Sequence, residues 1–284
     1  MKIVYVTGLG RSGTTLLDIL LNAHSQMQGV GEVHKLYGFA HVLRNPNPQS
    51  VDSIGNTCAC GAATIWDCPF WTAVDAELTE RTGRGLKDLR LEARDRATFE
   101  RDNLDLFRAV QAVSGAAYVI DSSKRVTRLR WLLKHPEIEV VPIHVLRNPK
   151  GRASSVKRRK GQVFRPTVQY SYRSLRLFAL LFNRPHLVVR YERLAAEPEA
   201  EMRRIMGYLG LDYEPAQVND WANSAHHNLA GNAVRRATSS EIGLRESWRE
   251  ELGWATRAGI DLIAAPGRAL NWVKEWRWRD AAKG

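Results

Sequence analysis

Short hydrophobic runs alternate along the chain with longer segments whose apolar residues recur at helical spacing. The runs that predict buried strands lie at 2–7, 27–30, 117–120, 140–146 and 187–189. The segments that predict helices lie at 14–24, 123–133, 150–159 and 199–209. Strands that alternate with helices build a parallel sheet through right-handed crossovers. The pattern therefore predicts an α/β fold in three layers, with a central parallel sheet between helices.

Residues 45–115 interrupt this alternation. The Asn-Pro-Asn-Pro run at 45–48 begins a turn-rich stretch, and the stretch from about 70 to 112 is charged and has helical spacing. Neither a repeat nor a low-complexity linker divides the chain. We therefore expect a single domain over 1–284, in which 45–115 is a loop-and-helix insertion on the substrate side.

The first strand leads directly into a glycine-rich loop, Gly8-Leu9-Gly10-Arg11-Ser12-Gly13-Thr14-Thr15. Gly8 and Gly13 have the spacing of a phosphate-binding loop (P-loop), but Thr14 stands where an ATPase has its lysine. Glycines let backbone N–H groups turn toward an anion, and the N-terminus of the next helix adds positive charge. The loop predicts a P-loop-like fold with a cradle for a phosphate or sulfate group that does not hydrolyse ATP. The cradle is expected to be lined by Gly10, Arg11, Ser12, Gly13, Thr14 and Thr15.

A second anion site is predicted where the strand at 140–146 ends. Arg147 follows this strand, and Ser155 lies eight residues later in the predicted helix. Ligands of open α/β sheets bind at the carboxyl ends of strands. An arginine can hold a phosphate through two hydrogen bonds, and a hydroxyl can add a third. Together with the glycine-rich loop, Arg147 and Ser155 imply a ligand with two separated anionic groups.

In this order and spacing, the motifs resemble the sulfotransferases that use 3′-phosphoadenosine-5′-phosphosulfate (PAPS), above all the bacterial branch and its protein-tyrosine and carbohydrate relatives. Their 5′-phosphosulfate loop is similar to 10–15, and their 3′-phosphate element is similar to Arg147 with Ser155. The segment 189–194, Val-Arg-Tyr-Glu-Arg-Leu, is a further similarity, and 225–253 is a loose one. The resemblance implies in-line transfer of a sulfonate group from PAPS to a hydroxyl. Adenosine 3′,5′-diphosphate (PAP) would be the product, and no metal would be required.

The resemblance also implies roles for single residues. Arg11 would stabilise the leaving 5′-phosphate, and Tyr191 would belong to the nucleotide site. Arg235 and Trp248 would close over the nucleotide, with surface arginines as the alternative interpretation. Lys124, which follows an apolar strand, would reach the sulfonate or the bridging oxygen, unless it is a solvated lysine at a helix start.

Glu32 is the predicted general base. It lies 21 residues after Arg11 and is similar in position to the glutamate of the tyrosine-sulfating branch. His34 and Asp18 are the rival bases. A purely structural Glu32 is a further alternative.

Lys and Arg number 42 against 30 Asp and Glu, which gives a net charge of +12. Such an excess favours a polyanionic partner, although an arginine-rich composition alone could cause it. The densest basic run, 157–160, lacks interleaved aromatic residues, so we expect no nucleic-acid partner. The expected acceptor is the hydroxyl of a sugar, a lipid-linked glycan or a small metabolite. An ATP-using P-loop kinase and a basic nucleic-acid- or membrane-binding protein are the alternatives.

Three cysteines are too few for a disulfide scaffold, and neither a signal peptide nor an apolar run of about 18 residues is seen. We therefore expect a soluble cytoplasmic protein, with no spanning segment. Cys58, Cys60 and Cys68 are expected to be a reduced cluster or an occasional disulfide; zinc with a histidine such as His41 is the alternative. The tryptophans of 272–278 are expected to pack the last helix onto the core, with peripheral membrane contact as the alternative.

Overall fold

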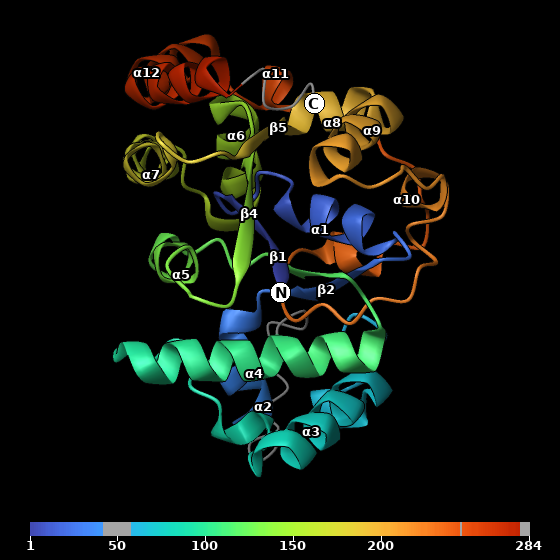
Figure 1. The fold of residues 1–284 in the computed structure, drawn as a ribbon. Helices are drawn as coiled ribbons and strands as arrows, with labels where there is room; N and C mark the ends of the chain where they lie inside the picture. The colour runs from blue at the N-terminus through green and yellow to red at the C-terminus, as the bar shows by residue number, and fades with distance from the viewer. Residues whose placement is uncertain (42–57, 245, 279–284) are drawn as a thin grey trace. The chain divides into compact units, whose positions relative to one another are not determined.

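The computed structural model describes residues 1–41, 58–244 and 246–278. The strands form one parallel sheet in the order β2-β3-β1-β4-β5 (Figure 1). They are β1 (Lys2–Gly8), β2 (Met27–Gly31), β3 (Tyr118–Asp121), β4 (Glu139–Leu146) and β5 (Leu187–Arg190). The predicted α/β fold class, a P-loop-like parallel sheet flanked by helices, is confirmed.

The strands are short and apolar because helices cover a parallel sheet on both faces. In β1 the four residues from Ile3 to Val6 have no exposed surface. β3 pairs with β1 from Lys2↔Tyr118 to Tyr5↔Asp121, and it pairs with β2 as far as Gly31↔Asp121. The carboxyl ends of β2 and β3 therefore lie next to each other, and so do the segments that follow them.

The chain divides into two compact units. The first contains residues 1–6, 15–141 and 214–240. The second contains residues 7–14, 142–213 and 241–284, of which 245 and 279–284 lie outside the described residues.

The described helices of the first unit include those of the region inserted between β2 and β3. They are α1 (Thr14–Asn22, whose first residue belongs to the second unit), η1 (Val33–Lys35), α2 (Leu36–His41), η3 (Ile65–Asp67), α3 (Pro69–Thr82), η4 (Leu86–Asp88), α4 (Arg96–Ser114), α5 (Val126–Leu132), α10 (Ala216–Asn219) and η5 (Ala233–Arg236). α3 packs against α4 (Figure 1). Of the expected insertion, 58–115 is built as a turn followed by helices, and 45–57 lies outside the described residues.

Helix α5 begins three residues later than the hydrophobic pattern predicts. Asp121 accepts a hydrogen bond from the Ser123 N–H (2.8 Å), and Lys124 has a left-handed backbone with φ 62°. The first feature is a local turn closed by a side chain, and the second excludes Lys124 from a regular right-handed helix. Residues 122–125 therefore form a short loop at the end of β3.

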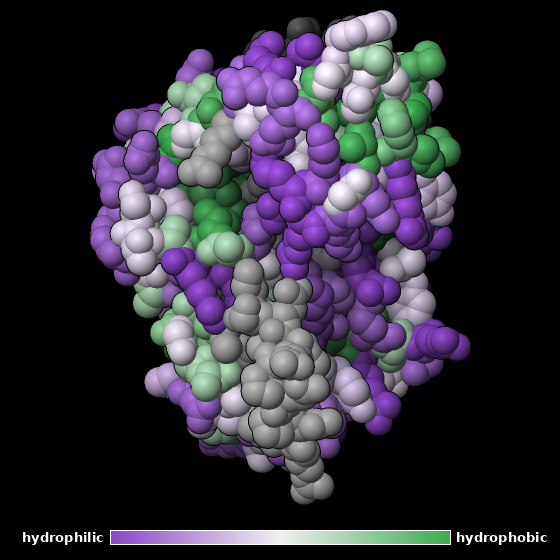
Figure 2. All heavy atoms as spheres, turned by 180° about the vertical axis from the view of Figure 1, so that it is seen from behind, coloured by the Kyte–Doolittle hydropathy of each residue, from purple (hydrophilic) through white to green (hydrophobic). Residues whose placement is uncertain are grey.

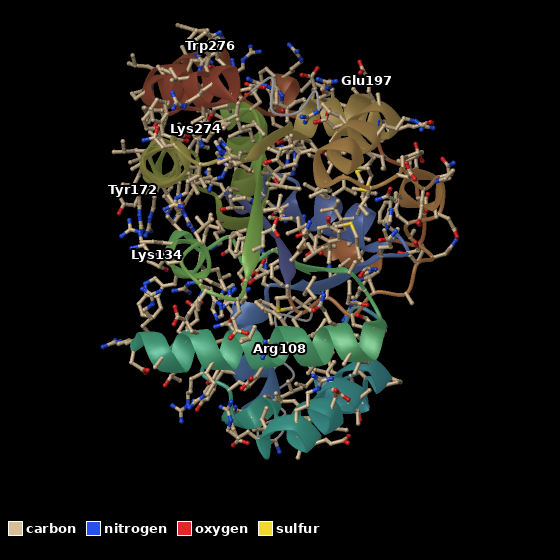
Figure 3. All side chains as sticks on the ribbon, in the orientation of Figure 1. Arg108, Lys134, Tyr172, Glu197, Lys274 and Trp276 are labelled. Carbon is tan, nitrogen blue, oxygen red and sulfur yellow. The ribbon has the colours of Figure 1, made fainter. Side chains whose placement is uncertain are left out.

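The second unit is mainly helical around β4 and β5. Its helices are α6 (Pro149–Lys160), α7 (Phe164–Leu181), α8 (Tyr191–Ala196), α9 (Pro198–Leu209), α11 (Trp248–Glu251) and α12 (Trp254–Arg277). The long helices α7 and α12 lie side by side (Figure 1). Lys274 lies on the side of α12 that faces α7, whereas Trp276 lies away from it and is exposed (Figure 3).

Hydrophilic residues cover much of the face drawn in Figure 2, as expected for a chain with 25% charged residues. None of the helices in the described part of the chain combines the length and the hydrophobicity needed to cross a membrane.

Candidate functional site

The glycine-rich loop of the second unit is a tight turn packed against an aromatic ring. The Ser12 N–H donates to the Leu9 carbonyl (3.2 Å) and closes the turn. Gly13 has φ 92°, and a Cβ atom at this position would lie 2.5 Å from Cδ2 of Tyr191. Only glycine therefore fits at residue 13 while the Tyr191 ring supports the loop. The predicted nucleotide residue Tyr191 thus shapes the cradle from behind.

The structure brings the two predicted anion-binding elements together. The Arg11 Nε donates to the Ser155 hydroxyl (2.9 Å), and the Arg147 Nη1 donates to the Arg11 carbonyl (2.8 Å). The Arg147 guanidinium also stacks on Tyr191, with 4.3 Å between its Cζ atom and the ring centroid. Arg11, Arg147 and Ser155 therefore belong to one constellation at the carboxyl ends of β1 and β4.

Positive charge converges on Arg11. Burial lowers the pKa of Arg11, and the nearby charges of Arg159, Arg147 and Arg158 lower it further. Burial also lowers the pKa of Arg147. Such depressed pKa values mean that like charges are held together at a cost, which a bound anion would offset.

Three further arginines act at this cradle. Arg158 and Arg159 belong to the basic run 157–160, to which the sequence assigned no ligand, and Arg152 was not singled out from the sequence. The Arg152 Nε donates to the Gly10 carbonyl (3.1 Å), and burial lowers the pKa of Arg152 to about 10. Arg152, Ser155 and Arg159 recur at positions i, i+3 and i+7 of α6, which places them on one helical face. That periodicity, read from Ser155 outward, is the signal that could have found two of the three.

Trp248 lies in the hydrophobic core of the second unit. It is 7% exposed and packs in a cluster with Ala153, Leu252 and Ile260. Its ring also lies 5.1 Å from the Lys150 ammonium. Trp248 therefore supports α6, which carries Ser155, rather than presenting an open face.

At the start of α1, Thr14 and Thr15 are buried. The Thr15 hydroxyl accepts a hydrogen bond from the Asn232 N–H (3.3 Å) within the first unit. The N–H groups in the first turn of a helix have no acceptor within that helix. Together with the positive end of the helix dipole, they provide an anion-binding element after Gly13.

Glu32 and Lys124 form an ion pair in the first unit, at the adjoining ends of β2 and β3. Their side chains are 14% and 13% exposed, so the pair is largely desolvated. Lys35 contacts the other carboxylate oxygen of Glu32 (2.7 Å). Burial alone would raise the pKa of Glu32, but Lys124 and Lys35 outweigh it and lower the pKa to about 2. Glu32 is therefore an ionised acceptor at neutral pH.

The two rival bases have different environments. Asp18 is fully buried and accepts a hydrogen bond from the Ser122 hydroxyl (2.5 Å), and burial raises its pKa to about 7. Burial lowers the pKa of His34 to about 4, so its imidazole is neutral. The Lys124 ammonium contacts Glu32, and its charge also acts on the Asp18 carboxyl.

Arg235 is buried in the first unit, where its Nη1 donates to the Asn228 carbonyl (3.0 Å). Burial and the neighbouring Arg236 lower its pKa to about 10, whereas the charge of Glu32 opposes this shift. The backbone just before Arg235 is tied to β2, because the Glu32 N–H donates to the Leu229 carbonyl (2.7 Å). Segment 226–235 therefore lies beside the Glu32–Lys124 pair. The loose sequence similarity in 225–253 did not reveal this position.

A model of the sulfotransferase family matches residues 4–215 of the chain, about three quarters of its length. Known structures with the same fold include a sulfotransferase domain of the olefin synthase of Synechococcus PCC 7002. It is 17% identical, with a TM-score of 0.60, and the match covers 93% of this chain and 94% of that one. A sulfotransferase domain from the curacin biosynthetic pathway is 14% identical, with a TM-score of 0.54 and coverage of 93% and 96%. No curated protein sequence matches the chain.

Proposed function

The chain belongs to the sulfotransferase family, and from that premise we propose that it transfers a sulfonate group from PAPS to a hydroxyl acceptor. The acceptor is a sugar, a lipid-linked glycan or a small metabolite. The observation that carries the proposal is the cradle around Arg11, in which partly buried arginines and a hydroxyl converge on a loop that only glycine can form.

The residues of the second unit suit a ligand with phosphate groups. Arg11 and Arg147 supply guanidinium groups, Ser155 supplies a hydroxyl, and the loop before α1 supplies backbone N–H groups. Thr14 stands in place of the lysine with which an ATPase grips a β/γ-phosphate. The cradle therefore favours a phosphosulfate with a separate 3′-phosphate over ATP.

Glu32 and Lys124 of the first unit are the proposed chemical pair. Glu32 accepts the proton of the acceptor hydroxyl while the hydroxyl oxygen attacks sulfur. The new bond joins that oxygen to sulfur, and the bond from sulfur to the bridging oxygen breaks, so that PAP leaves. Lys124 and Arg11 stabilise the negative charge that develops on the bridging and phosphate oxygens, which gives most of the rate in such reactions.

The low pKa of Glu32 has a consequence for this role. A general base is most effective when its pKa is near the working pH, and a carboxylate of pKa about 2 binds a proton weakly. Because Lys124 is the main cause of the depression, a sulfonate that draws the Lys124 ammonium to itself raises the basicity of Glu32. Lys124 thus couples cosubstrate binding to activation of the base.

Thermal unfolding with PAP, ADP or ATP with Mg²⁺, each at the same concentration, tests the proposal. A ligand at 100 times its dissociation constant adds about 2.7 kcal/mol of stability, which a melting curve detects readily. We expect a large shift with PAP, and its loss in Arg147→Ala. Stabilisation by ATP with Mg²⁺ alone would contradict the proposal and favour a kinase.

A further inference from the structure

Three thiols and one imidazole converge in the first unit, on side chains to which the proposed reaction assigns no role. Cys58 and Cys60 lie on a turn, Cys68 precedes α3, and His227 comes from the segment after α10. Their four ligand atoms all lie within 4.8 Å of one another. We call this group the thiol–imidazole cluster.

The spacing within the cluster is that of a tetrahedral metal site. The Cys60 and Cys68 sulfur atoms are 3.6 Å apart, and the His227 Nδ1 lies 3.2 Å from the Cys68 sulfur and 3.8 Å from the Cys58 sulfur. Zinc–sulfur bonds of about 2.3 Å and zinc–nitrogen bonds of about 2.0 Å at tetrahedral angles put sulfur pairs about 3.8 Å and sulfur–nitrogen pairs about 3.5 Å apart. The sulfur–sulfur separation of 3.6 Å lies close to the first value, and the two sulfur–nitrogen separations lie on either side of the second.

We propose that the thiol–imidazole cluster binds one structural zinc ion. Three thiolates and one imidazole are soft to borderline ligands that select zinc over magnesium or calcium, and they fill all four positions of a closed structural site. The proposal does not depend on the nature of the transferase reaction.

A disulfide explains the cluster less well. A disulfide joins sulfur atoms about 2.05 Å apart and involves two of the three cysteines. It would not account for the third thiol and the His227 imidazole at the same place. The separation of 3.6 Å between Cys60 and Cys68 is far from that bond length. The histidine that sequence reasoning named, His41, is not in the cluster; its Nδ1 lies 2.8 Å from the Tyr37 carbonyl instead.

The neighbours of His227 hold its ring in position, as the surroundings of a metal ligand do. The Phe70 ring stacks on the imidazole, with 4.7 Å between centroids and 9° between planes. The Trp71 indole N–H donates to the His227 carbonyl (2.8 Å). Both aromatic residues lie in the first turn of α3, directly after Cys68.

Zinc at this cluster would fasten the 58–68 loop to the segment that supports Glu32. Leu229, two residues after His227, donates its N–H to the Val30 carbonyl (3.1 Å), and its carbonyl accepts the Glu32 N–H (2.7 Å). A Cβ atom on Gly31 would meet the Leu229 carbonyl at 2.5 Å, so the two segments are in close contact. The zinc ion would therefore act as a positioning element for the end of β2.

Elemental analysis of the purified full chain, produced with zinc in the medium, is the first test. We expect about one zinc per chain, as a four-ligand structural site binds one ion. Protein produced with cobalt instead should show the visible absorption of tetrahedral cobalt thiolate. A preparation that holds no zinc and whose three thiols react at once with a thiol reagent would overturn the proposal. So would a disulfide between Cys60 and Cys68.

Variants separate the cluster from incidental binding. Cys60→Ser and His227→Gln should lose the zinc, and His41→Gln, the matched control, should retain it. If His227→Gln keeps both the zinc and the cobalt spectrum, the assignment is wrong. Should the two cluster variants fail to fold, the metal content and cobalt spectrum of the unaltered chain decide the question alone.

Hydrogen exchange tests the fastening role without an activity assay. Removal of zinc by a chelator should speed exchange in peptides that cover 30–34 and 226–232, because their shared hydrogen bonds lose their anchor. Peptides of α7, in the other unit, are the internal control. Unchanged exchange at 30–34 after complete zinc removal would overturn this role.

Discussion

Arg11 and Lys124 hold left-handed backbone conformations, with φ values of 73° and 62°. A non-glycine residue in this region costs about 1–3 kcal/mol and persists only where surrounding contacts enforce it. At Arg11 the enforcing contacts are the hydrogen bonds to Ser155 and from Arg147; at Lys124 the ion pair with Glu32 contributes. Backbone strain is therefore found at two residues whose side chains the proposed reaction uses.

Glu32→Gln should abolish turnover and leave PAP binding intact. The amide keeps the size of the side chain but cannot accept the proton, which should lower kcat by roughly 10²–10⁴-fold. Sulfonate transfer is measured with a panel of hydroxyl acceptors, and PAP binding by calorimetry.

The control for this variant is Glu197→Gln, which changes an exposed carboxylate of the second unit (Figure 3). It should match the unaltered enzyme in both assays. Retained turnover in Glu32→Gln would remove Glu32 as the base and return attention to Asp18 and His34.

Asp18→Asn should remove a pH dependence of stability. The pKa of Asp18 is raised from 3.8 to about 7 in the fold, so the folded chain holds a proton there that the unfolded chain has lost. Stability from this group is therefore complete below 3.8 and is lost as pH rises toward 7, by roughly 4 kcal/mol in all.

The measurement for Asp18 is urea unfolding of both proteins across that pH range. The difference between them isolates this one group, and Asn keeps an oxygen that accepts the Ser122 hydroxyl. The advantage of the unaltered chain over Asp18→Asn should shrink with rising pH. A constant difference would mean that Asp18 is ionised throughout.

At the scale of elements, the glycine-rich loop is the part that the sequence predicts best. Its function needs a strand, a turn that only glycine can make and a helix start, and these follow one another within 2–22. Local rules are sufficient for such a motif. The segment 122–125, which carries Lys124, was predicted less well, because the hydrophobic pattern places it in a helix whereas the left-handed backbone of Lys124 keeps it out of α5.

Gly13→Ala should destroy the cradle. The added Cβ would lie 2.5 Å from the Tyr191 ring, and φ 92° is strained for alanine. We expect the PAP-induced shift in melting temperature to disappear. Gly207→Ala, inside α9 with open space around it, is the matched control and should keep the shift. An equal shift in both variants would contradict the account of the loop.

For the whole molecule, the fold gathers residues that are far apart in the sequence. Sequence reasoning considered the net charge of +12 and the run at 157–160 without a ligand in view; the structure sets Arg158 and Arg159 beside Arg11. His227 lies 159 residues from Cys68, so spacing along the chain could not identify it. The fold brings such residues together, and the spacing of residues along a single sequence does not reveal contacts between positions so far apart.

The tryptophans of the last helix have two different environments. Trp278 donates its indole N–H to the Phe182 carbonyl (3.1 Å), which ties α12 to the end of α7. Trp272 and Trp276 are 63% and 62% exposed. Of the three tryptophans in 272–278, only Trp278 therefore has the expected packing role.

The second unit contains a buried basic pair that should set its stability at alkaline pH. Lys274 is fully buried on α12, and its ammonium lies 2.8 Å from the His144 Nδ1 on β4. Burial lowers the pKa of Lys274 from 10.5 to about 7, and burial lowers that of His144 as well. Between 7 and 10.5 the unfolded chain therefore binds a proton that the folded chain releases, and stability from this group rises with pH across that window.

Lys274→Met should remove this rise and stabilise the chain at neutral pH. Methionine fills a similar volume without a charge to desolvate, whereas the lysine is destabilised by up to about 5 kcal/mol below pH 7. Urea unfolding of both proteins across the window measures the difference, which should be largest near 7 and vanish toward 10.5. If Lys274→Met were less stable than the unaltered chain at neutral pH, the hydrogen bond to His144 would outweigh the desolvation of the ammonium, and α12 would be held on β4 by that bond.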